Sequence, residues 1–418
     1  MNNFINEYYQ AIKEGSVIVG RWITLLYEYI VKGLENKSFY FAPKKANRAI
    51  SYIENYCHHS KGRNDLFKLE LWQKALVSII FGVVDENNYR QFREIVLIVA
   101  RKNGKSLFAA AIMDYVAFLD DEYGAEIYCL APKLEQAEIV YSCFWQMCLA
   151  EEETRTKIQK RGRQSDFYIP DSNTIIKKVA FNAKKSDGFN PHLVVCDEVA
   201  SWVGDAGKKQ YEVMKSALGA RNQPLILSCT TSGYVNEGIY DELFKRGTRF
   251  LLGDSKEQRL LPVFYTIDDE EKWNDINELA KANPNLGVSV SVDYMLECIQ
   301  KYDNLSLDDF PNMEPSKRKY IQEKLISVPN PNEQNEWADI VSMLGIPSQD
   351  LLDALNNYIR HWETTRPAGN HVDEAWNEVS KVESELAAKQ TQIEENDWNS
   401  VDTLSQASLI GHLNKYPR

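Results

Sequence analysis

The spacing of apolar residues changes along the chain. Up to about residue 63 apolar residues recur at helical intervals, as in ITLLYEYIVKGL and ANRAISYIENY. From residue 64 to residue 253 short continuous apolar runs alternate with helical stretches; the runs are EIVLIVA (94–100), AEIYCLAP (125–132), PHLVVCDE (191–198) and PLILSCTT (224–231). Such runs are typical of parallel strands covered by helices on both faces. The pattern therefore predicts an N-terminal helical segment (1–63) and an α/β core (64–253).

The rest of the chain follows neither rhythm. Residues 254–337 mix short apolar stretches with connections rich in Asp, Glu, Asn and Pro, and we expect a lid or linker subdomain there. Further on, Val372, Val379, Leu386 and Ile393 recur every seven residues. This spacing predicts an amphipathic helix that packs on another helix or on a partner. We therefore expect a mostly helical tail over residues 338–418.

Composition and charge narrow the class of protein. The 418 residues are 44% apolar and 26% charged, as in globular proteins. The longest apolar stretch, residues 75–84, is far shorter than the ~20 residues that cross a bilayer, and the N-terminus does not resemble a secretory signal. Seven cysteines without a CxxC pair predict reduced thiols. We expect a cytoplasmic protein with no membrane association.

The net charge of −12 is unevenly distributed. Residues 338–418 contain 13 acids and 6 bases, a net charge of −7, which leaves −5 for the first 337 residues. An almost balanced body can still present a basic face locally. The overall charge therefore neither supports nor excludes binding to DNA.

A phosphate-binding pattern follows the first core strand. EIVLIVA leads into Arg101-Lys102-Asn103-Gly104-Lys105-Ser106 and then into a helical stretch. In a strand–turn–helix that ends in GK[S/T], backbone N–H groups face phosphate, the lysine reaches the β- and γ-phosphates, and the serine binds Mg²⁺. Val99 stands where the usual pattern has its first glycine, so an ordinary turn with exposed cations is the alternative. We predict ATP binding by Asn103, Gly104, Lys105 and Ser106.

A second motif makes the ATPase interpretation much stronger. The apolar run HLVVCDE ends in two adjacent carboxylates, Asp197 and Glu198. Adjacent residues at a strand end point to opposite sides. Asp197 can therefore serve the Mg²⁺, while Glu198 polarises the attacking water as general base. Together with the phosphate loop, this pair predicts a P-loop ATPase core of the ASCE type, with a mainly parallel sheet.

Two further segments fit such a core. Gln73, at the start of a helical stretch before the phosphate loop, can read adenine through its amide; a plain helix start is an equal alternative. Thr230-Thr231-Ser232-Gly233 ends a later strand with hydroxyls and a glycine. That segment can sense loss of the γ-phosphate, or it can be a simple exit from the strand.

These motifs together resemble the large terminase subunit of tailed bacteriophages, of the HK97-like type. The resemblance rests on LxLWQ, the variant loop ARKNGKS, SDGFNPHLVVCDE, RNQP before TTSG, and ANPNLG followed by VSVDYM, and it covers residues ~1–337. It implies a motor that uses ATP and Mg²⁺ to move double-stranded DNA into a capsid. A homo-oligomeric ring, a portal protein and a small terminase subunit are implied as partners, in a bacterial host cell.

The resemblance also implies roles for single residues. Lys105 and Ser106 serve ATP and Mg²⁺, Arg101 stabilises charge, Asp197 binds the metal and Glu198 is the catalytic base. Gln73 is the adenine reader, and Thr230 to Gly233 form the coupling motif. An arginine that acts in trans on a neighbour's nucleotide can be Arg221, or it can belong to the group Arg155, Arg161 and Arg163.

The C-terminal part departs from this family. Large terminases carry an RNase H-like nuclease after the motor, and its chemistry needs carboxylates from several strands around two metal ions. Residues 338–418 show no strand-like runs that end in aspartate. We therefore expect no nuclease activity from this chain. Two other functions stay open: a helicase-like or regulatory nucleic-acid ATPase, and a non-catalytic docking protein that works through its acidic tail.

Overall fold

A computed structural model describes residues 3–162, 166–181, 188–233, 238–272 and 274–303. The chain divides into two compact units, and the first, Met1–Cys298, holds nearly all the described elements. The predicted helical tail and the predicted absence of a nuclease concern residues 338–418, which lie outside the described residues. Residues 304–337 of the expected lid also lie outside the described residues.

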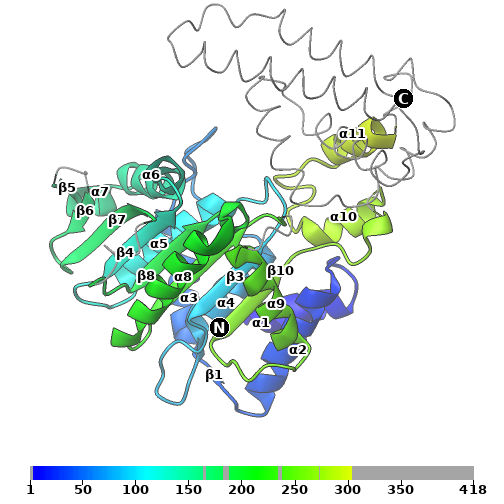
Figure 1. The fold of residues 1–418 in the computed structure, drawn as a ribbon, viewed down its shortest axis with the longest axis horizontal. Helices are drawn as coiled ribbons and strands as arrows, with labels where there is room; N and C mark the ends of the chain where they lie inside the picture. Colours follow the sequence, from blue (N-terminus) through cyan, green and yellow to red (C-terminus); the bar gives the residue numbers. More distant parts are fainter. Residues whose placement is uncertain (1–2, 163–165, 182–187, 234–237, 273, 304–418) are drawn as a thin grey trace, which may run out of the picture. The chain divides into compact units, whose positions relative to one another are not determined.

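A sheet of eight strands forms the centre of the first unit, in the spatial order β10-β3-β9-β8-β4-β7-β6-β5 (Figure 1). Its strands are β3 (Glu94–Ile98), β4 (Glu126–Ala131), β5 (Gln159–Arg161), β6 (Asp166–Ile169), β7 (Thr174–Ala180), β8 (Leu193–Asp197), β9 (Leu225–Thr230) and β10 (Leu260–Phe264). Neighbours from β10 to β7 run parallel, whereas the pairs β7–β6 and β6–β5 run antiparallel. The predicted α/β fold with a mainly parallel sheet is confirmed.

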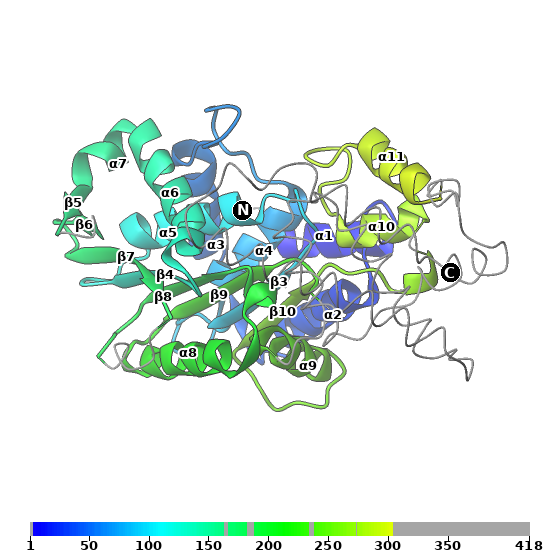
Figure 2. The same ribbon diagram turned by 45° about the horizontal axis from the view of Figure 1, so that its top comes forward.

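Helices cover both faces of the central strands (Figure 2). One face carries α3 (Pro43–Tyr56), α4 (Leu71–Gly82), α5 (Lys105–Leu119) and α6 (Leu134–Ala150), and the other carries α8 (Gly204–Ala217) and α9 (Ile239–Leu251). Every residue of β3, β8, β9 and β10 is buried. Burial on both faces explains why these strands are continuous apolar runs rather than alternating ones.

The N-terminal segment is helical, as predicted, and it packs on the core. It contains α1 (Phe4–Lys13), α2 (Arg21–Glu35), a short strand β1 (Tyr40–Phe41) paired with β2 (Val83–Val84), and α3. Tyr265 directly follows β10, and its hydroxyl lies 3.1 Å from the Tyr8 hydroxyl of α1. The segment therefore shares the hydrophobic core of the sheet.

The core sheet extends beyond Gly253, because β10 pairs with β3. After it come α10 (Ile276–Ala282) and α11 (Val292–Asp303); the short helix α7 (Glu152–Lys157) and the 3-10 turns η2 (Val199–Ser201), η3 (Leu218–Ala220) and η4 (Glu270–Lys272) complete the described elements. All seven cysteines are free thiols. Within the described part of the chain, no helix combines the length and the apolar character needed to cross a bilayer.

Candidate active site

Three of the motifs meet because three adjacent parallel strands end at one edge of the sheet. The order β3-β9-β8 places the loop after β3, the threonines after β9 and the carboxylates at the end of β8 side by side. Ligands of open α/β sheets bind outside the carboxyl ends of the strands. The topology therefore builds the predicted site from segments far apart in the sequence.

The phosphate loop has the backbone of an anion-binding turn. Lys102 has φ +66° and Gly104 has φ +78°, and α5 begins directly after them at Lys105. Left-handed residues next to right-handed ones turn successive N–H groups to one side, and the helix N-terminus adds a positive partial charge. This geometry suits phosphate even though the first glycine of the usual pattern is missing.

The charged and hydroxyl side chains of the two motifs contact one another. The Ser106 hydroxyl donates to Asp197, with 3.4 Å between Oγ and Oδ2. The Lys105 ammonium lies 3.1 Å from Oε1 of Glu198. The structure thus brings together the four residues that the sequence predicts for ATP, Mg²⁺ and catalysis.

Asp197 is a strongly perturbed carboxyl group. Burial and the neighbouring Glu198 raise its pKa to about 6, against the opposing effects of Lys105, the Glu198 N–H and the Ser106 hydroxyl. A cation at this carboxylate would relieve both unfavourable effects. Among the described residues no group of three or more His, Cys, Asp and Glu side chains could hold a metal. A hydroxyl and one carboxylate instead fit Mg²⁺, which nucleotide sites hold by one or two protein oxygens together with phosphates.

Glu198 has an unusual backbone. Its φ of +50° lies in the left-handed region, which a non-glycine residue adopts at some cost in energy. The side chain is 45% exposed while its partner Lys105 is 8% exposed. The turn therefore projects a partly solvated carboxylate toward the lysine of the phosphate loop.

The predicted coupling motif contacts the turn that follows Glu198. The Thr230 hydroxyl accepts a hydrogen bond from Ala200 N at 3.1 Å, and its carbonyl accepts one from Val99 N at the same distance. A Cβ added at Gly233 would lie only 2.6 Å from the Ala200 Cβ. Thr231 is half-buried between them. The segment is therefore in direct contact with the turn that follows Asp197 and Glu198.

Three other predicted residues lie near the site in different states. The Arg101 side chain is exposed at the start of the loop. Asn103 is fully buried, and its side-chain amide is bonded inside the protein, so only its backbone is left to contact a ligand. Gln73 is 1% exposed, and its Oε1 accepts from Glu70 N as part of a capping box at the start of α4. Adenine reading by Gln73 stays a prediction.

The structure narrows the choice of arginine in trans. Arg221 precedes β9 and therefore lies at the opposite edge of the sheet; its guanidinium bonds Glu122 at 2.7 Å, the Gly124 carbonyl at 2.7 Å and Asn190. These bonds give Arg221 a structural role. Arg155 and Arg161 are exposed, whereas Arg163 lies outside the described residues.

Sequence reasoning gave no role to the segment after α10. Asn283, Asn285 and Ser289 all form hydrogen bonds with the phosphate loop. The motif ANPNLG was visible, but nothing in it points to a partner about 180 residues upstream.

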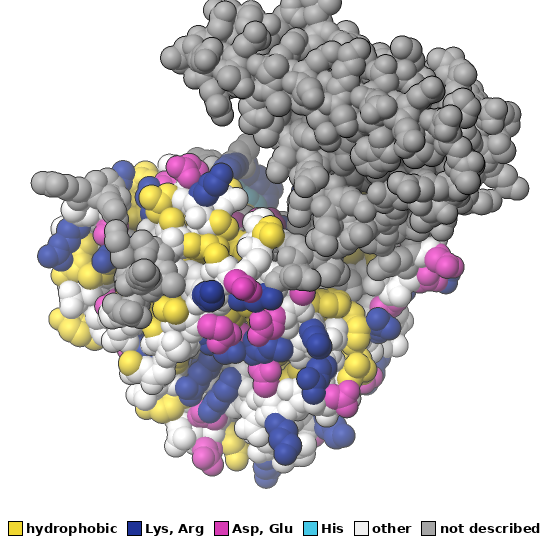
Figure 3. Space-filling model, in the orientation of Figure 1, with side chains coloured by type: hydrophobic (Ala, Val, Ile, Leu, Met, Phe, Trp, Pro, Cys, Tyr) yellow, Lys and Arg dark blue, Asp and Glu magenta, His cyan; other side chains and the backbone are white. Residues whose placement is uncertain are grey.

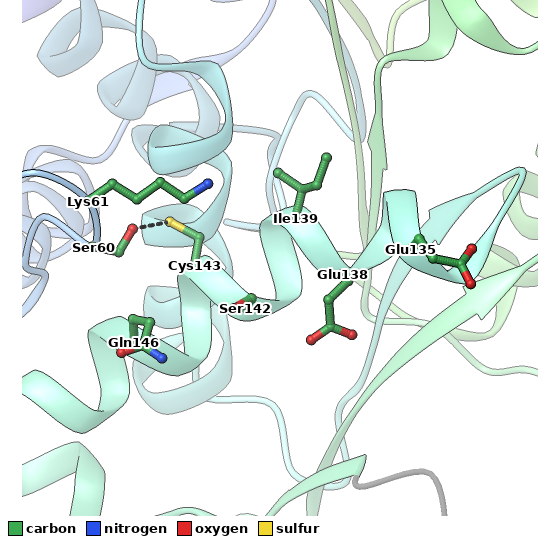
Figure 4. A pocket seen from close by; sticks show the side chains of 8 residues that line it. All are labelled: Ser60, Lys61, Glu135, Glu138, Ile139, Ser142, Cys143 and Gln146. Atoms are coloured by element: carbon green, nitrogen blue, oxygen red, sulfur yellow. Dashed lines mark hydrogen bonds between the residues drawn. The ribbon is translucent and has the colours of Figure 1, made fainter. Parts of the chain in front are cut away.

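A surface hollow of about 160 Å³ lies apart from these residues. It is lined by Ser60 and Lys61 together with residues of α6 that include Glu138 and Cys143 (Figure 4). None of the predicted nucleotide residues lines it.

On the face shown in Figure 3, basic and acidic side chains are interspersed rather than segregated.

Comparison with known proteins agrees with this geometry. Residues 71–249 match the family model "Terminase large subunit, ATPase domain". Protein YmfN of Escherichia coli (strain K12) is 36% identical over 121 residues, which are 29% of this chain and 26% of YmfN.

One solved structure in particular shares the fold. The HK97 bacteriophage large terminase matches with a TM-score of 0.51 and 22% identity, over 64% of this chain and 53% of that chain. The Thermus phage P74-26 large terminase ATPase domain matches with a TM-score of only 0.32 and 16% identity, over 57% of this chain and 84% of that chain. This chain thus spans about half of the HK97 protein and about a quarter of YmfN.

Proposed function

We propose that this chain is the ATP-driven motor that moves double-stranded DNA during viral genome packaging, because residues 71–249 match the terminase large-subunit ATPase family model. One observation carries the proposal: Ser106 meets Asp197, and Lys105 meets Glu198, at the end of the central strands. These are the side chains that phosphoryl transfer to water requires, in mutual contact.

Each residue of the site has a distinct task in this proposal. The N–H groups of residues 103–106 and the Lys105 ammonium hold the phosphates, while Ser106 and Asp197 provide oxygens for Mg²⁺. Mg²⁺, when bound, neutralises charge on the β- and γ-phosphates. Glu198 accepts a proton from the attacking water, and the exposed Arg101 stabilises charge that develops on the phosphates.

In this proposal, the ion pair between Lys105 and Glu198 belongs to the site without nucleotide. Triphosphate competes with the Glu198 carboxylate for the same ammonium group, so its binding releases the base. A carboxylate freed from Lys105 can turn toward water. The pair thereby couples arrival of the substrate to activation of the general base.

Partners follow from the premise of a terminase motor. We propose that the chain acts on duplex DNA in the bacterial cytoplasm, as a homo-oligomeric ring, with a portal protein and a small terminase subunit. Phosphate contacts would dominate its affinity for DNA, so binding should weaken steeply with added salt. One of Arg155, Arg161 and Arg163 would act on the neighbour's nucleotide.

The test compares ATP hydrolysis by the whole chain with that of two site variants. Lys105→Ala and Glu198→Gln should each lower DNA-stimulated kcat by about 10²-fold or more, because they remove a phosphate contact and the general base. Lys209→Ala and Glu212→Gln, on exposed positions of α8, serve as charge-matched controls. Hydrolysis undiminished in either site variant would end the proposal.

The choice of nucleic acid separates the motor from the alternative functions. A packaging motor should be stimulated most by duplex DNA, whereas stimulation by single strands or RNA would favour a helicase-like ATPase. A docking protein would show no hydrolysis with Mg²⁺ at all.

We further propose that this polypeptide does not cut DNA. The support is the sequence of residues 338–418, in which no strand-like apolar run ends in aspartate and apolar residues recur at seven-residue spacing. Incubation of the purified chain with plasmid and Mg²⁺ or Mn²⁺ should leave the plasmid intact. Metal-dependent nicking that co-purifies with the chain would contradict this.

A further inference from the structure

Four carbonyl groups at the phosphate loop accept hydrogen bonds from side chains. The Asn103 amide nitrogen donates to the carbonyls of Ala100 and Arg101 at 3.1 and 3.2 Å. Ser289 Oγ donates to the Lys102 carbonyl at 2.7 Å. Asn285 Nδ2 donates to the Asn103 carbonyl at 3.3 Å. Two of these four carbonyls are thus satisfied from the segment after α10.

The same segment fixes the Asn103 side chain itself. Asn103 Nδ2 donates to Asn283 Oδ1 at 2.9 Å, and Asn103 Oδ1 accepts from Asn285 N at 3.0 Å. All three asparagines are buried, with Asn103 at 0% exposure. A buried amide with all these bonds has one orientation, so the segment determines how the loop's internal bonds are made.

The segment is held in place independently of the loop. Asn283 Nδ2 donates to the Leu279 carbonyl, and the Asn285 carbonyl accepts from the N–H groups of Ser289 and Val290. Asn285 Oδ1 accepts from Trp72 Nε1 at 2.7 Å, and the buried Trp72 ring packs near Phe108 and Tyr265. The turn is therefore anchored by contacts other than those with the loop.

A loop that points its N–H groups at an anion must point its carbonyls the other way, where they need donors. Here the loop also lacks the first glycine of the common pattern, since Val99 occupies that position. Hydrogen-bond donors from outside the loop can stabilise the loop conformation that the first glycine would otherwise favour. A loop held ready in its binding shape binds more tightly, because affinity falls in proportion to the fraction of molecules in that shape.

We infer that Asn283, Asn285 and Ser289 are positioning residues that hold the phosphate loop ready for nucleotide. The inference rests on the proposed function of the loop. These side chains contact loop backbone and Asn103, not the nucleotide, so their loss should weaken binding of the nucleotide far more than the chemical step. The residues after α10 thereby set the nucleotide affinity of the motor.

Ser289 provides the mildest test, because its side chain is exposed and its removal cannot leave a cavity. Ser289→Ala should raise the Kd of the full chain for a fluorescent ADP with Mg²⁺ by about fivefold, the effect of one net hydrogen bond. Ser289→Thr keeps the hydroxyl and should restore the Kd to within about twofold. Equal affinities of the alanine and threonine variants would refute the role of this hydroxyl.

Asn285→Asp provides the stronger test. It keeps the acceptor for Trp72 but loses the donor to Asn103 and places a carboxylate beside that carbonyl. We expect the Kd for nucleotide, and the KM for ATP, to rise about tenfold or more while kcat changes less than about threefold. Asn277→Ala, an exposed asparagine of α10 that contacts Asp275, is the matched control and should change neither.

The outcomes separate this inference from the proposed function. If the unaltered chain binds no MgADP, the proposed function fails. If the unaltered chain binds and both Ser289→Ala and Asn285→Asp bind equally well, the positioning role fails. A fall in kcat with unchanged KM, together with a lower melting temperature, would mean that the segment only stabilises the fold.

Discussion

Asp114 shows how a single residue of the phosphate-loop helix can dominate the pH dependence of stability. It lies fully buried in α5, where its carboxyl accepts from the Tyr52 hydroxyl at 3.2 Å and faces the thiols of Cys57 and Cys148 at 3.7 and 3.9 Å. Burial outweighs these three donors and raises its pKa to about 7. Tyr52 lies in α3, Cys57 directly follows α3, and Cys148 lies in α6. None of these three groups carries a positive charge.

The sign of the effect follows from proton binding. Asp114 binds its proton more tightly in the native state than in the unfolded state, so stability must fall as pH rises from about 4 to about 7. Three pKa units correspond to a loss of at most about 4 kcal/mol. Asp114→Asn keeps an oxygen for Tyr52 and removes the charge; it should be more stable than the parent at pH ~8 and show little difference at pH ~4.

Denaturant unfolding at several pH values measures this difference. Asp171→Asn, on an exposed turn, is the control and should leave the pH profile unchanged. A free energy of unfolding for Asp114→Asn that follows the parent at every pH would contradict the expectation.

At the residue scale, the sequence identifies those candidate site residues that belong to contiguous motifs. Lys105, Ser106, Asp197 and Glu198 follow apolar strands directly, and parallel topology brings strand ends together. Asn285 could not be found in this way. Its role depends on hydrogen bonds between neutral side chains distant in sequence, and an asparagine next to a proline has the same sequence signature in any turn.

Strand β9 and the turn after β8 form the contact that we propose for coupling to the nucleotide. Gly233 approaches Ala200 so closely that a methyl group added at Gly233 would lie 2.6 Å from the Ala200 methyl group. Gly233→Ala must therefore push the β9 exit away from the turn that carries Glu198. Overpacking of this kind costs about 1–3 kcal/mol.

We expect Gly233→Ala to lower ATP hydrolysis at least severalfold while MgADP binding changes little, because the phosphate loop itself is untouched. Ala200→Gly in the same chain removes the clashing methyl group and should restore most of the activity. Gly219→Ala, where an added methyl meets nothing within 4 Å, is the control. Failure of the double variant to recover would exclude the clash as the cause.

At the element scale, the four runs predicted as strands correspond to β3, β4, β8 and β9. The sequence pattern does not predict β10, because Pro262 lies in the middle of its apolar run. A proline is tolerated there since β10 is an edge strand that pairs with β3 alone. The hairpin β5–β6 and strand β7 also escape notice, since polar residues interrupt their apolar residues and these strands are only partly buried.

At the scale of the whole molecule, the proposed nucleotide site draws on contacts between residues as distant in sequence as Trp72 and Tyr294. Trp72 of α4, the loop after β3 and Ser289 are joined by hydrogen bonds, and the Lys102 ammonium lies 4.0 Å from the centre of the Tyr294 ring in α11. All these residues belong to Met1–Cys298. Local patterns indicate separate helical, core and lid segments, but such long-range contacts are invisible to them.

A chain that ends at residue 303 should therefore keep the nucleotide site. We expect it to unfold cooperatively and to bind MgADP with a Kd within about twofold of the full chain. A chain that ends at residue 272 loses α10, α11 and the turn between them, which removes the donors to two loop carbonyls and the acceptor of Trp72. It should bind at least about tenfold more weakly, because each lost hydrogen bond contributes about 1 kcal/mol. Circular dichroism melts of both chains control for folding. Weak binding by a well-folded chain of residues 1–303 would show that the remaining residues contribute to the site, and tight binding by the shorter chain would show that the loop needs no support from the turn.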